Sequence, residues 1–390
     1  MGFMSRIYLD HAETTPMIHE AVEAMTRELT RVGNASSLHA SGRSARRIVE
    51  ESREVIAALV GAKPAEVIFT GGGTESDNLA IKGAFWSGAE SGRRRLVTST
   101  VEHHAVLDSI GWLGRSDSAD VSYVPVDSDG RLDMAALNSA VGSDTALVSI
   151  MWANNEVGTL QPVRQIAELS AERGAISHSD AVQAVGHIEV DFGVSELDLL
   201  SFTAHKLGGP YGIGVLLARR ELKLAPILHG GGQERDVRSG TLDVAATAGF
   251  AAALEVAIKN RVQEEHRIRQ LRRELVSSVL ATVPWAIRYG PGAEEDELPG
   301  IASIGFPGCS ADAILMLLDA AGIDCATGAA CSAGVSHPSH VLIAMGCSEA
   351  EAGSVLRFSL GHSSTFADVQ ALVSALPEAV RRAKAAAVVA

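Results

Sequence analysis

The sequence contains little cysteine, little proline and no long hydrophobic run. Four cysteines in 390 residues, with no Cys-x-x-Cys pair, are too few for a disulfide framework. No uncharged apolar stretch approaches the roughly 20 residues that a membrane-spanning helix needs. The first ten residues also contain no apolar segment of signal-peptide length. We therefore expect a cytoplasmic protein that does not contact the membrane.

Basic residues are scarce as well. Thirty-three lysines and arginines stand against 47 acidic residues, which gives a net charge of −14. This balance argues against nucleic acid or an anionic membrane as the main partner. Hydrophobic residues make up 46% and charged residues 21% of the chain, which is typical of soluble globular proteins and excludes a disordered or collagen-like chain.

Short apolar segments alternate with helical patterns over the first part of the chain. Residues 42–59 carry apolar side chains at helical spacing, residues 67–70 resemble a buried strand, and residues 74–86 resemble the next helix. The same alternation predicts strands over 95–100, 121–124, 146–151, 198–203 and 212–217, helices from 103 and over 162–173, and a short helix after Asp180. Such alternation predicts a mostly parallel sheet covered on both faces.

The rhythm changes after residue 241. An alanine-rich helical stretch over 242–279 is expected to lead into a second domain. The pattern beyond it predicts strands near 301–306, 323–326 and 354–360, and helices over 311–320, 338–345 and 365–383. We expect a large sheet-based domain followed by a smaller C-terminal one.

A glycine run lies between the strand predicted over 67–70 and the helix that follows it, where residues 70–75 are Thr-Gly-Gly-Gly-Thr-Glu. Backbone N–H groups at a helix N-terminus can bind an anion, and Thr74 adds a hydroxyl. The run can equally be only a tight turn. It matches neither the dinucleotide-binding nor the P-loop pattern.

Asp180 and Gln183 lie in the segment His-Ser-Asp-Ala-Val-Gln over 178–183. Ser179 or Asp180 could simply cap a following helix. Alternatively, an aspartate at the C-terminal end of a strand points into the crevice where α/β sheets bind ligands. There its carboxylate could hold a protonated ring nitrogen.

Lys206 and Cys331 are the two candidate nucleophiles. Lys206 follows an apolar strand pattern and precedes a glycine-rich turn. A lysine partly removed from water has a lowered pKa and can form a Schiff base. The alternative is a solvated lysine, as most lysines are. Cys331 lies among small residues over 328–334, which favours an exposed loop thiol that can attack as a nucleophile over a buried apolar cysteine. The remaining cysteines, expected to be structural, are Cys309, Cys325 and Cys347.

A metal site is not predicted. Cys331, His337 and His340 have the spacing Cys-x5-His-x2-His. This spacing is not a common zinc pattern, and a fourth ligand is missing.

The motifs occur in the order in which one enzyme family has them. The matching segments are 8–10, 33–37 (Gly-Asn-Ala-Ser-Ser), 69–78, 102–103, 153–159 (Ala-Asn-Asn-Glu-Val-Gly-Thr), 180–183, 205–206, 230–234, 238–241 (Arg-Ser-Gly-Thr), 327–331 and 356–361 (Leu-Arg-Phe-Ser-Leu-Gly). With them the chain resembles the cysteine desulfurases of the NifS/IscS type, which are pyridoxal 5'-phosphate (PLP) enzymes of the class V aminotransferase group. The match spans nearly the whole chain.

The resemblance implies the type I fold of PLP-dependent transferases. In this α/β fold a mostly parallel seven-stranded sheet forms the large domain, and a smaller α+β domain accompanies it. It places the large, PLP-binding domain at residues 16–258. Residues 1–15 and 259–390 then form the small domain, which carries the loop with the catalytic cysteine.

The resemblance also implies roles for the site residues. Lys206 carries the cofactor covalently, Asp180 pairs with its pyridinium nitrogen, and His103 stacks on the ring and moves protons. The further cofactor contacts implied are Gln183, Asn155, Gly73, Thr74, Thr203, His205 and, from the neighbouring subunit of a homodimer, Thr241. The implied substrate-binding residues are Arg357, whose guanidinium suits a carboxylate, Asn155 and Asn34.

The implied reaction converts L-cysteine to L-alanine and leaves the sulfur on Cys331 as a persulfide. The sulfur then passes to an acceptor protein of iron–sulfur cluster assembly, of tRNA thiolation or of another pathway. Glu13 departs from the family pattern, which has alanine there, and a carboxylate facing the pocket would repel that of the substrate. Ala326 and Ala329 replace serines, so we expect a higher thiol pKa at Cys331.

Two alternatives stay open. One is a related PLP-dependent lyase or aminotransferase for another amino acid; Cys331 argues against it, and Glu13 argues for it. The other is a catalytically weak protein that only binds a sulfur carrier. The presence of Lys206, Asp180 and His103 argues against that reading, and a yellow colour of the purified protein would support either enzyme.

Overall fold

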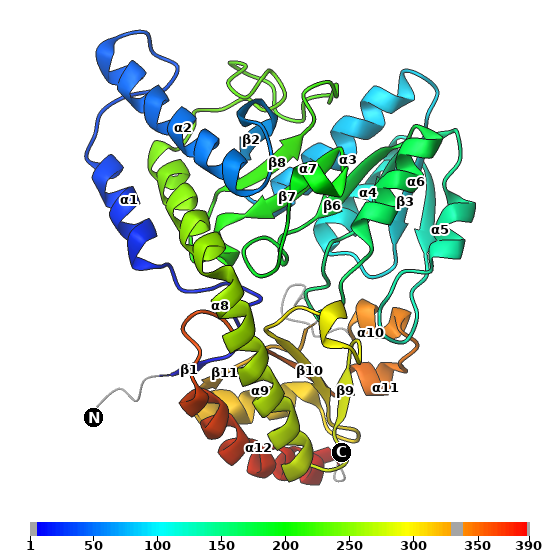
Figure 1. Cartoon of the computed structure of the whole chain (residues 1–390). Coiled ribbons are helices and arrows are strands. Elements are labelled where there is room, and N and C mark those ends of the chain that lie inside the picture. The colour runs from blue at the N-terminus through cyan, green and yellow to red at the C-terminus, as the bar shows by residue number, and fades with distance from the viewer. Residues whose placement is uncertain (1–5, 329–337, 388–390) are drawn as a thin grey trace.

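The computed structural model describes residues 6–328 and 338–387. Figure 1 shows an upper body built on a seven-stranded sheet and a lower body built on a three-stranded sheet, joined by the long helix α8 (Val244–Thr282). Phe250 and Leu254 of α8 pack in the core beside the large sheet, whereas Leu271 and Leu275 pack in the core of the lower body. The predicted domain boundary at 258/259 falls inside this continuous helix and stays a prediction.

The large sheet has the strand order β2-β8-β7-β6-β5-β3-β4. Its strands are β2 (Val67–Thr70), β3 (Arg95–Ser99), β4 (Asp120–Val124), β5 (Thr145–Ser149), β6 (Ile176–Asp180), β7 (Leu199–Thr203) and β8 (Gly214–Ala218). Strand β8 is antiparallel to both of its neighbours, and the other neighbouring pairs are parallel. The predicted mostly parallel seven-stranded sheet is confirmed.

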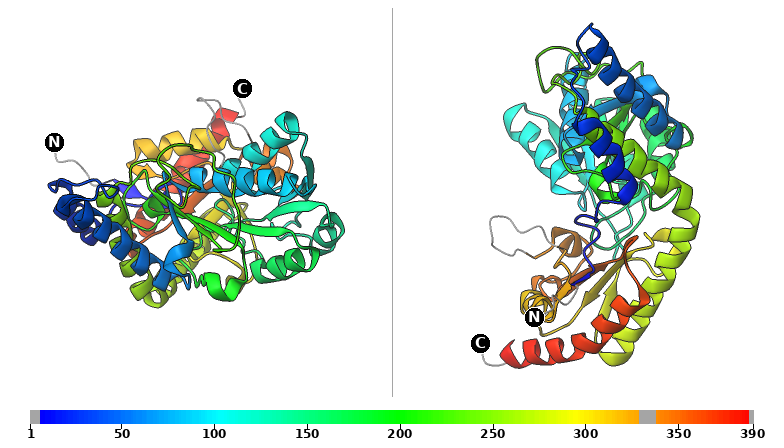
Figure 2. Two further views of the ribbon diagram at one scale, coloured as in Figure 1. Left: turned by 90° about the horizontal axis from the view of Figure 1, so that it is seen from above. Right: turned by 90° about the vertical axis from the view of Figure 1, so that its left-hand side faces the viewer.

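Helices cover both faces of this sheet (Figure 2). The alternation of side chains along β2 shows how: Val67 and Phe69 join the core under α2 and α8, while Ile68 joins the core under α3 and α4. Because both faces are covered, strands such as β5 and β8 are buried at every position. The helices of this body are α1 (His19–Leu29), α2 (Ala40–Leu59), α3 (Gly73–Ala89), α4 (His104–Ser116), α5 (Met134–Ala140), α6 (Val163–Arg173) and α7 (Phe192–Ser195), with short 3-10 turns at Pro64–Glu66 and Ala204–Lys206.

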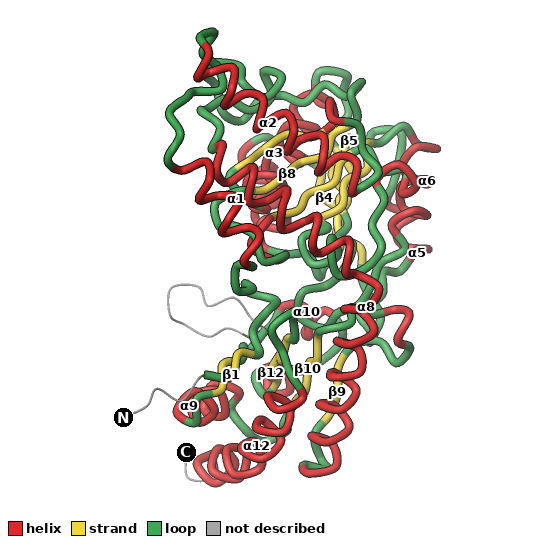
Figure 3. Tube along the Cα trace, turned by 60° about the vertical axis from the view of Figure 1, so that its left-hand side comes forward, coloured by secondary structure: helices red, strands yellow, loops and turns green. Residues whose placement is uncertain are grey.

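The lower body combines the two ends of the chain. Its antiparallel sheet has the order β12-β10-β9, and a separate two-stranded sheet pairs β1 with β11 in parallel. The strands are β1 (Ile7–Tyr8), β9 (Ile287–Tyr289), β10 (Ile301–Gly305), β11 (Ile323–Asp324) and β12 (Val355–Ser359), and the helices are α9 (Ala311–Ala320), α10 (His340–Ala344), α11 (Glu349–Ala352) and α12 (Phe366–Ala387), with a 3-10 turn at Glu294–Asp296. Figure 3 shows β1 beside this sheet, so the chain starts in the lower body and then crosses to the upper one.

The short helix predicted after Asp180 is α7, which begins only at Phe192, and some elements went unpredicted. No helix directly follows Asp180: residues 181–187 form turns, and Asp180 Oδ1 instead accepts a hydrogen bond from the backbone N–H of Val182 at 2.9 Å. Helix α1 was missed because only Ala21 and Ala24 of it are buried, which leaves a weak apolar stripe. Helix α5 and strand β9 were also not predicted. Within the described ranges, no helix is both long and apolar enough to cross a bilayer.

Candidate active site

The predicted site residues meet at one edge of the large sheet. Gly73 begins α3 after β2, His103 precedes α4 after β3, Asn155 follows β5, Asp180 ends β6, and Lys206 follows β7. These strands are parallel to one another, so their carboxyl ends lie at the same edge. Residues far apart in the sequence are thereby brought to one place.

A pocket of about 590 Å³ lies at this edge, and we call it the sheet-edge pocket. The predicted residues that line it are Gly73, Thr74, His103, Asn155, Asp180, Gln183, Thr203, His205 and Lys206. The lower body contributes Leu315 of α9 and residues 325–328, and the N-terminal segment contributes Ala12 and Glu13. The pocket is therefore closed by both bodies of the molecule.

Lys206 is held in the pocket by backbone carbonyls. Its Nζ donates to the carbonyl oxygen of Ala12 at 2.5 Å and also to that of Glu13. Burial lowers the pKa of Lys206 to about 8, against the opposing pull of the Glu13 carboxylate. Near neutral pH a useful fraction of the side chain is thus the free amine, which is the form that attacks a carbonyl carbon.

Asp180 lies at the end of β6 with 6% of its surface exposed. Burial raises the pKa of Asp180, and His103 and the Val182 N–H bond oppose that rise. The buried Asp77 lies close by, and burial together with the Asp180 charge raises the pKa of Asp77 well above its usual range. The two buried carboxyl groups therefore disfavour each other's ionisation, and the hydrogen bond from the Val182 N–H favours the ionised form of Asp180.

The side chain of His103 is oriented by the helix that follows it. Its Nδ1 accepts a hydrogen bond from the backbone N–H of Ala105 at 3.1 Å. The neutral ring therefore carries its proton on Nε2. This leaves one N–H group for a ligand or a proton transfer.

Small residues and a helix N-terminus form another part of the pocket. A Cβ atom at Gly73 would lie 2.9 Å from Val182 Cγ2, so a larger residue would force the two segments apart. The N-terminus of α3 favours an anion there. The Thr203 hydroxyl donates to the Ile213 carbonyl at 2.9 Å. Burial, together with the charge of Lys206, lowers the pKa of His205 to about 4, so the His205 ring is neutral.

Arg357, on β12, lies behind the pocket wall with 1% of its surface exposed. Its Nη1 donates to the Asn155 carbonyl at 3.0 Å, and its Nη2 donates to Asp10 Oδ1 at 3.0 Å and to Glu13 Oε1 at 2.9 Å. Burial opposes its charge, but Glu13 and Asp10 outweigh that effect and raise the pKa of Arg357. This guanidinium is therefore a fixed positive charge that already holds two carboxylates.

Three of the described residues predicted for the site do not line the pocket: Arg357, Asn34 and Thr241. Asn34 lies exposed between α1 and α2, and Thr241 lies exposed before α8; neither lines the pocket. Cys331 lies outside the described residues. Gly328, the last described residue before it, lines the pocket.

The described cysteines have protonated thiols. Cys325 lines the pocket, and burial raises its pKa to about 12. Burial also raises the pKa of Cys309 and of Cys347. Over residues 6–328 and 338–387, no cluster of three His, Cys, Asp or Glu side chains could hold a metal ion.

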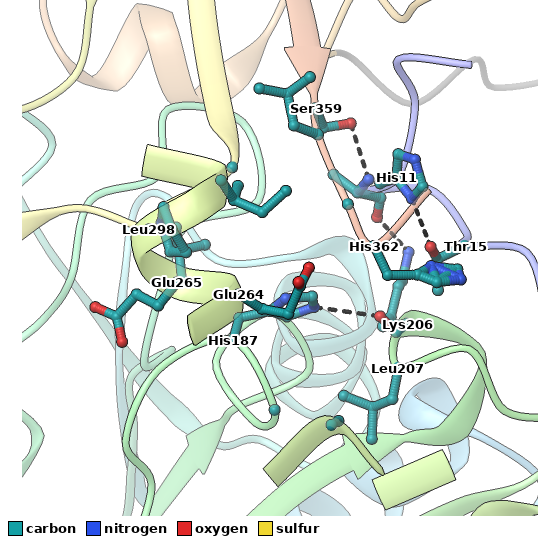
Figure 4. Close-up of a pocket in the computed structure, with 18 of the residues that line it drawn as sticks. His11, Thr15, His187, Lys206, Leu207, Glu264, Glu265, Leu298, Ser359 and His362 are labelled. Atoms are coloured by element: carbon teal, nitrogen blue, oxygen red, sulfur yellow. Dashed lines mark hydrogen bonds between the residues drawn. The ribbon is translucent and has the colours of Figure 1, made fainter. Parts of the chain in front are cut away.

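A second cavity of about 260 Å³, which we call the histidine pocket, shares Ala12, Gln183 and Lys206 with the first (Figure 4). Three histidines line it: His11, His187 and His362. His187 Nε2 lies 3.2 Å from the Lys206 carbonyl oxygen, and the rings of His11 and His362 lie 6.0 Å apart. Burial lowers the pKa of all three, that of His11 to about 3, so the histidine pocket is uncharged at these rings.

Comparison with known proteins decides the family. Residues 7–372 match the family model described as Aminotransferase class-V. The chain belongs to the class V aminotransferase family. It is 54% identical to an IscS-like cysteine desulfurase of Mycobacterium tuberculosis over 98% of both chains, and 42% identical to a cysteine desulfurase of Cereibacter sphaeroides over 98% of this chain and 97% of the other.

Solved structures of this class V family agree. A NifS-like protein superposes with a TM-score of 0.90 at 34% identity, covering 97% of this chain and 100% of the other. A structure of SspA in complex with cysteine superposes with a TM-score of 0.79 at 32% identity, covering 90% and 98%. The predicted family and fold are thereby confirmed.

The cofactor of this family is PLP, as predicted, and the described residues of this class V chain fit it. Lys206 offers a partly neutral amine, Asp180 a buried carboxylate, and the start of α3 a site for an anion. An aldehyde, a protonated ring nitrogen and a phosphate would find their chemical complements in those three places.

Two buried acids of the site were missed from the sequence. Asp77 lines the sheet-edge pocket, and its Oδ1 has no hydrogen-bond partner among the described residues. Glu156 also lines it, accepts a hydrogen bond from Ser339 at 2.5 Å and has a pKa raised to about 7 by burial. Both lie inside matched segments, but an acidic residue is ordinarily assumed to be solvated, so only the fold shows that they are buried.

Proposed function

We propose that this protein is a PLP-dependent cysteine desulfurase that converts L-cysteine to L-alanine and carries the released sulfur on Cys331. One observation carries the proposal. Lys206, with its lowered pKa, lies in the same pocket as the buried Asp180, and the rim of that pocket at Gly328 leads along the chain to Cys331.

When bound, PLP draws electrons from the substrate and thereby weakens its Cα–H bond. The residues of this chain supply the rest. The free amine of Lys206 takes up and returns the Cα proton, and His103, through Nε2, is placed to donate or accept a second one. Arg357 attracts the substrate's carboxylate, and Asp180 keeps a positive charge on the cofactor's ring nitrogen.

The sulfur step balances with no outside oxidant. The Cys331 thiolate attacks the substrate's sulfur, an S–S bond forms, and the Cβ–S bond breaks with its electron pair moving to carbon. That carbon is then protonated. One thiol and one cysteine thus give one persulfide and one alanine.

The test is alanine formation from L-cysteine in the presence of a reductant. We expect alanine from the wild type and none above background from Cys331→Ala. Cys325→Ala is the matched control, because Cys325 lines the same pocket with a thiol pKa of about 12, and it should remain active. A yellow wild-type protein that forms no alanine would contradict the proposal and favour an enzyme for another amino acid, the alternative that Glu13 supports.

The remaining parts of the proposal concern partners. We propose a homodimer, in which Thr241 and the exposed Asn34 face the neighbouring subunit's site; the exposed Leu29, Val32 and Leu38 nearby are 68%, 88% and 82% accessible, and apolar exposure of this kind favours an interface. The acceptor of the sulfur would be a protein of iron–sulfur cluster assembly or tRNA thiolation. A reactive thiol at Cys331 suits the reducing cytoplasm.

A further inference from the structure

Arg357 holds two carboxylates that differ in how firmly they are fixed. Asp10 Oδ1 and Glu13 Oε1 both accept from Nη2, at 3.0 and 2.9 Å. The side chain of Asp10 is 20% exposed, whereas that of Glu13 is 57% exposed. Asp10 is therefore part of the pocket wall, whereas Glu13 reaches Arg357 from the open pocket.

The backbone reinforces this difference. Asp10 forms a β-bridge with Ser359, two residues along β12 from Arg357, so its position is set by the sheet. Apart from the side-chain contact with Arg357, Glu13 is held by main-chain hydrogen bonds. Its carbonyl accepts from Lys206, and its N–H donates to the carbonyl of Asp10. Its side chain can thus rotate into the pocket without moving the backbone.

The positive charge of Arg357 is already more than balanced by its two carboxylate partners. Within this hydrogen-bonded group, one guanidinium and two carboxylates sum to −1 before any substrate arrives. Lys206, whose pKa is about 8, lies beside the group and offsets part of that charge while it is protonated. Burial opposes ionisation of Glu13, but Arg357 and Lys206 outweigh it and hold the pKa of Glu13 below its usual range, so Glu13 stays charged at neutral pH. A third carboxylate would meet a net negative group.

We propose that Glu13 is an internal competitor for the substrate's carboxylate: it occupies Arg357 in the empty pocket and must be displaced before an amino acid can bind there. The inference rests on the proposed function, because that function assigns the substrate's carboxylate to Arg357. Glu13 is thereby a specificity-determining residue. It weakens the binding of every small carboxylate, and only a ligand that gains additional contacts in the pocket overcomes it.

Glu13→Gln tests this directly, because the amide keeps the shape and removes the charge. The probe is 3-mercaptopropionate, which has the carboxylate and thiol of cysteine but no amine, titrated calorimetrically into the PLP-loaded protein. We expect binding to tighten by about fivefold to tenfold, which is the range for loss of a partly exposed ion-pair competitor. Arg357→Lys should weaken binding in both backgrounds.

The matched control is Asp108→Asn. Asp108 lies near the pocket, 3.3 Å from His104, with its side chain 77% exposed, and its replacement changes the net charge equally. Affinity should stay within about twofold of the wild type. Unchanged or weaker binding by Glu13→Gln, or equal tightening by both variants, would overturn the proposal.

Kinetics separates this inference from the proposed function. With L-cysteine, Glu13→Gln should lower KM by a similar factor, and the change should fall on KM rather than on kcat. If the wild type forms no alanine, the desulfurase proposal fails, while the titration with 3-mercaptopropionate still decides the role of Glu13.

Discussion

The two pockets that share Lys206 are both lined by several titratable groups but differ in charge. In the sheet-edge pocket, Lys206, Arg357 and Glu13 shift one another's pKa values and hold opposite charges in place. In the histidine pocket, burial lowers the pKa values of His11, His187 and His362, and these rings stay neutral. Buried titratable groups thus become charged only where an opposite charge comes from another part of the fold.

The source of the counter-charge explains the difference. Arg357, on β12 in the lower body, lies behind the wall of the sheet-edge pocket, where it holds Glu13 of the pocket and Asp10 of the N-terminal segment. The histidine pocket contains Glu264, but that carboxylate is bound by Arg267 at 2.7 Å. The Glu264 charge favours protonation of His362, but burial and the nearby Arg267 outweigh it and keep the pKa of His362 below its ordinary value.

The largest effect is expected from Lys206→Ala, which removes the titratable residue that both pockets share. We expect the protein to lose the visible absorbance of covalently held PLP and alanine formation to fall by at least about 1000-fold, because no other lysine is among the described residues that line the sheet-edge pocket. Absorbance after gel filtration and the alanine assay measure both. A variant that stays yellow would contradict the role given to Lys206.

Asp180→Asn should remove a carboxylate from the sheet-edge pocket and leave the fold intact. The amide cannot stabilise a protonated ring nitrogen, so we expect turnover to fall by about 100-fold while PLP remains bound. Rates at saturating cysteine, with cofactor content measured on the same sample, check this. Near-normal turnover would show that Asp180 serves only the turn at Val182.

His11→Asn should change the pH dependence of stability. The folded-state pKa of His11 is about 3, below its ordinary value of 6.5, so the unfolded chain takes up the proton first, and stability present above about pH 6.5 is lost as the pH falls. Between about pH 8 and pH 5 the wild type should lose about 1–2 kcal/mol more than His11→Asn. Urea unfolding at both pH values measures the difference, and parallel losses would refute the neutral state of His11.

The smallest effect is expected from His362→Gln, which changes a residue that lines the histidine pocket but not the sheet-edge pocket. Turnover should stay within about twofold of the wild type, whereas the matched change His103→Gln in the sheet-edge pocket should cost about 100-fold. Steady-state rates of both variants under the same conditions make the comparison. A large loss in His362→Gln would mean that the two pockets act together.

The sequence predicted the parts of this molecule that depend on local pattern. Helix α9 begins and ends at the residues predicted for it, and the alternation of buried strands and helices specified the large sheet. The arrangement at Arg357 was not predictable in the same way, because its partners at Asp10 and Glu13 lie 347 and 344 positions away. The histidine pocket likewise combines residues 11, 187 and 362, which no motif connects.

The pairing of Asp10 with Arg357 also has a consequence for synthesis on the ribosome. At about 5–20 residues per second, the partner of Asp10 emerges roughly 20–70 s after Asp10 itself, since 347 positions separate them. The strands of the large sheet are complete by Ala218, well before β12 is made. In a nascent chain, the strand end that carries Lys206 is therefore synthesised well before the strand that carries Arg357.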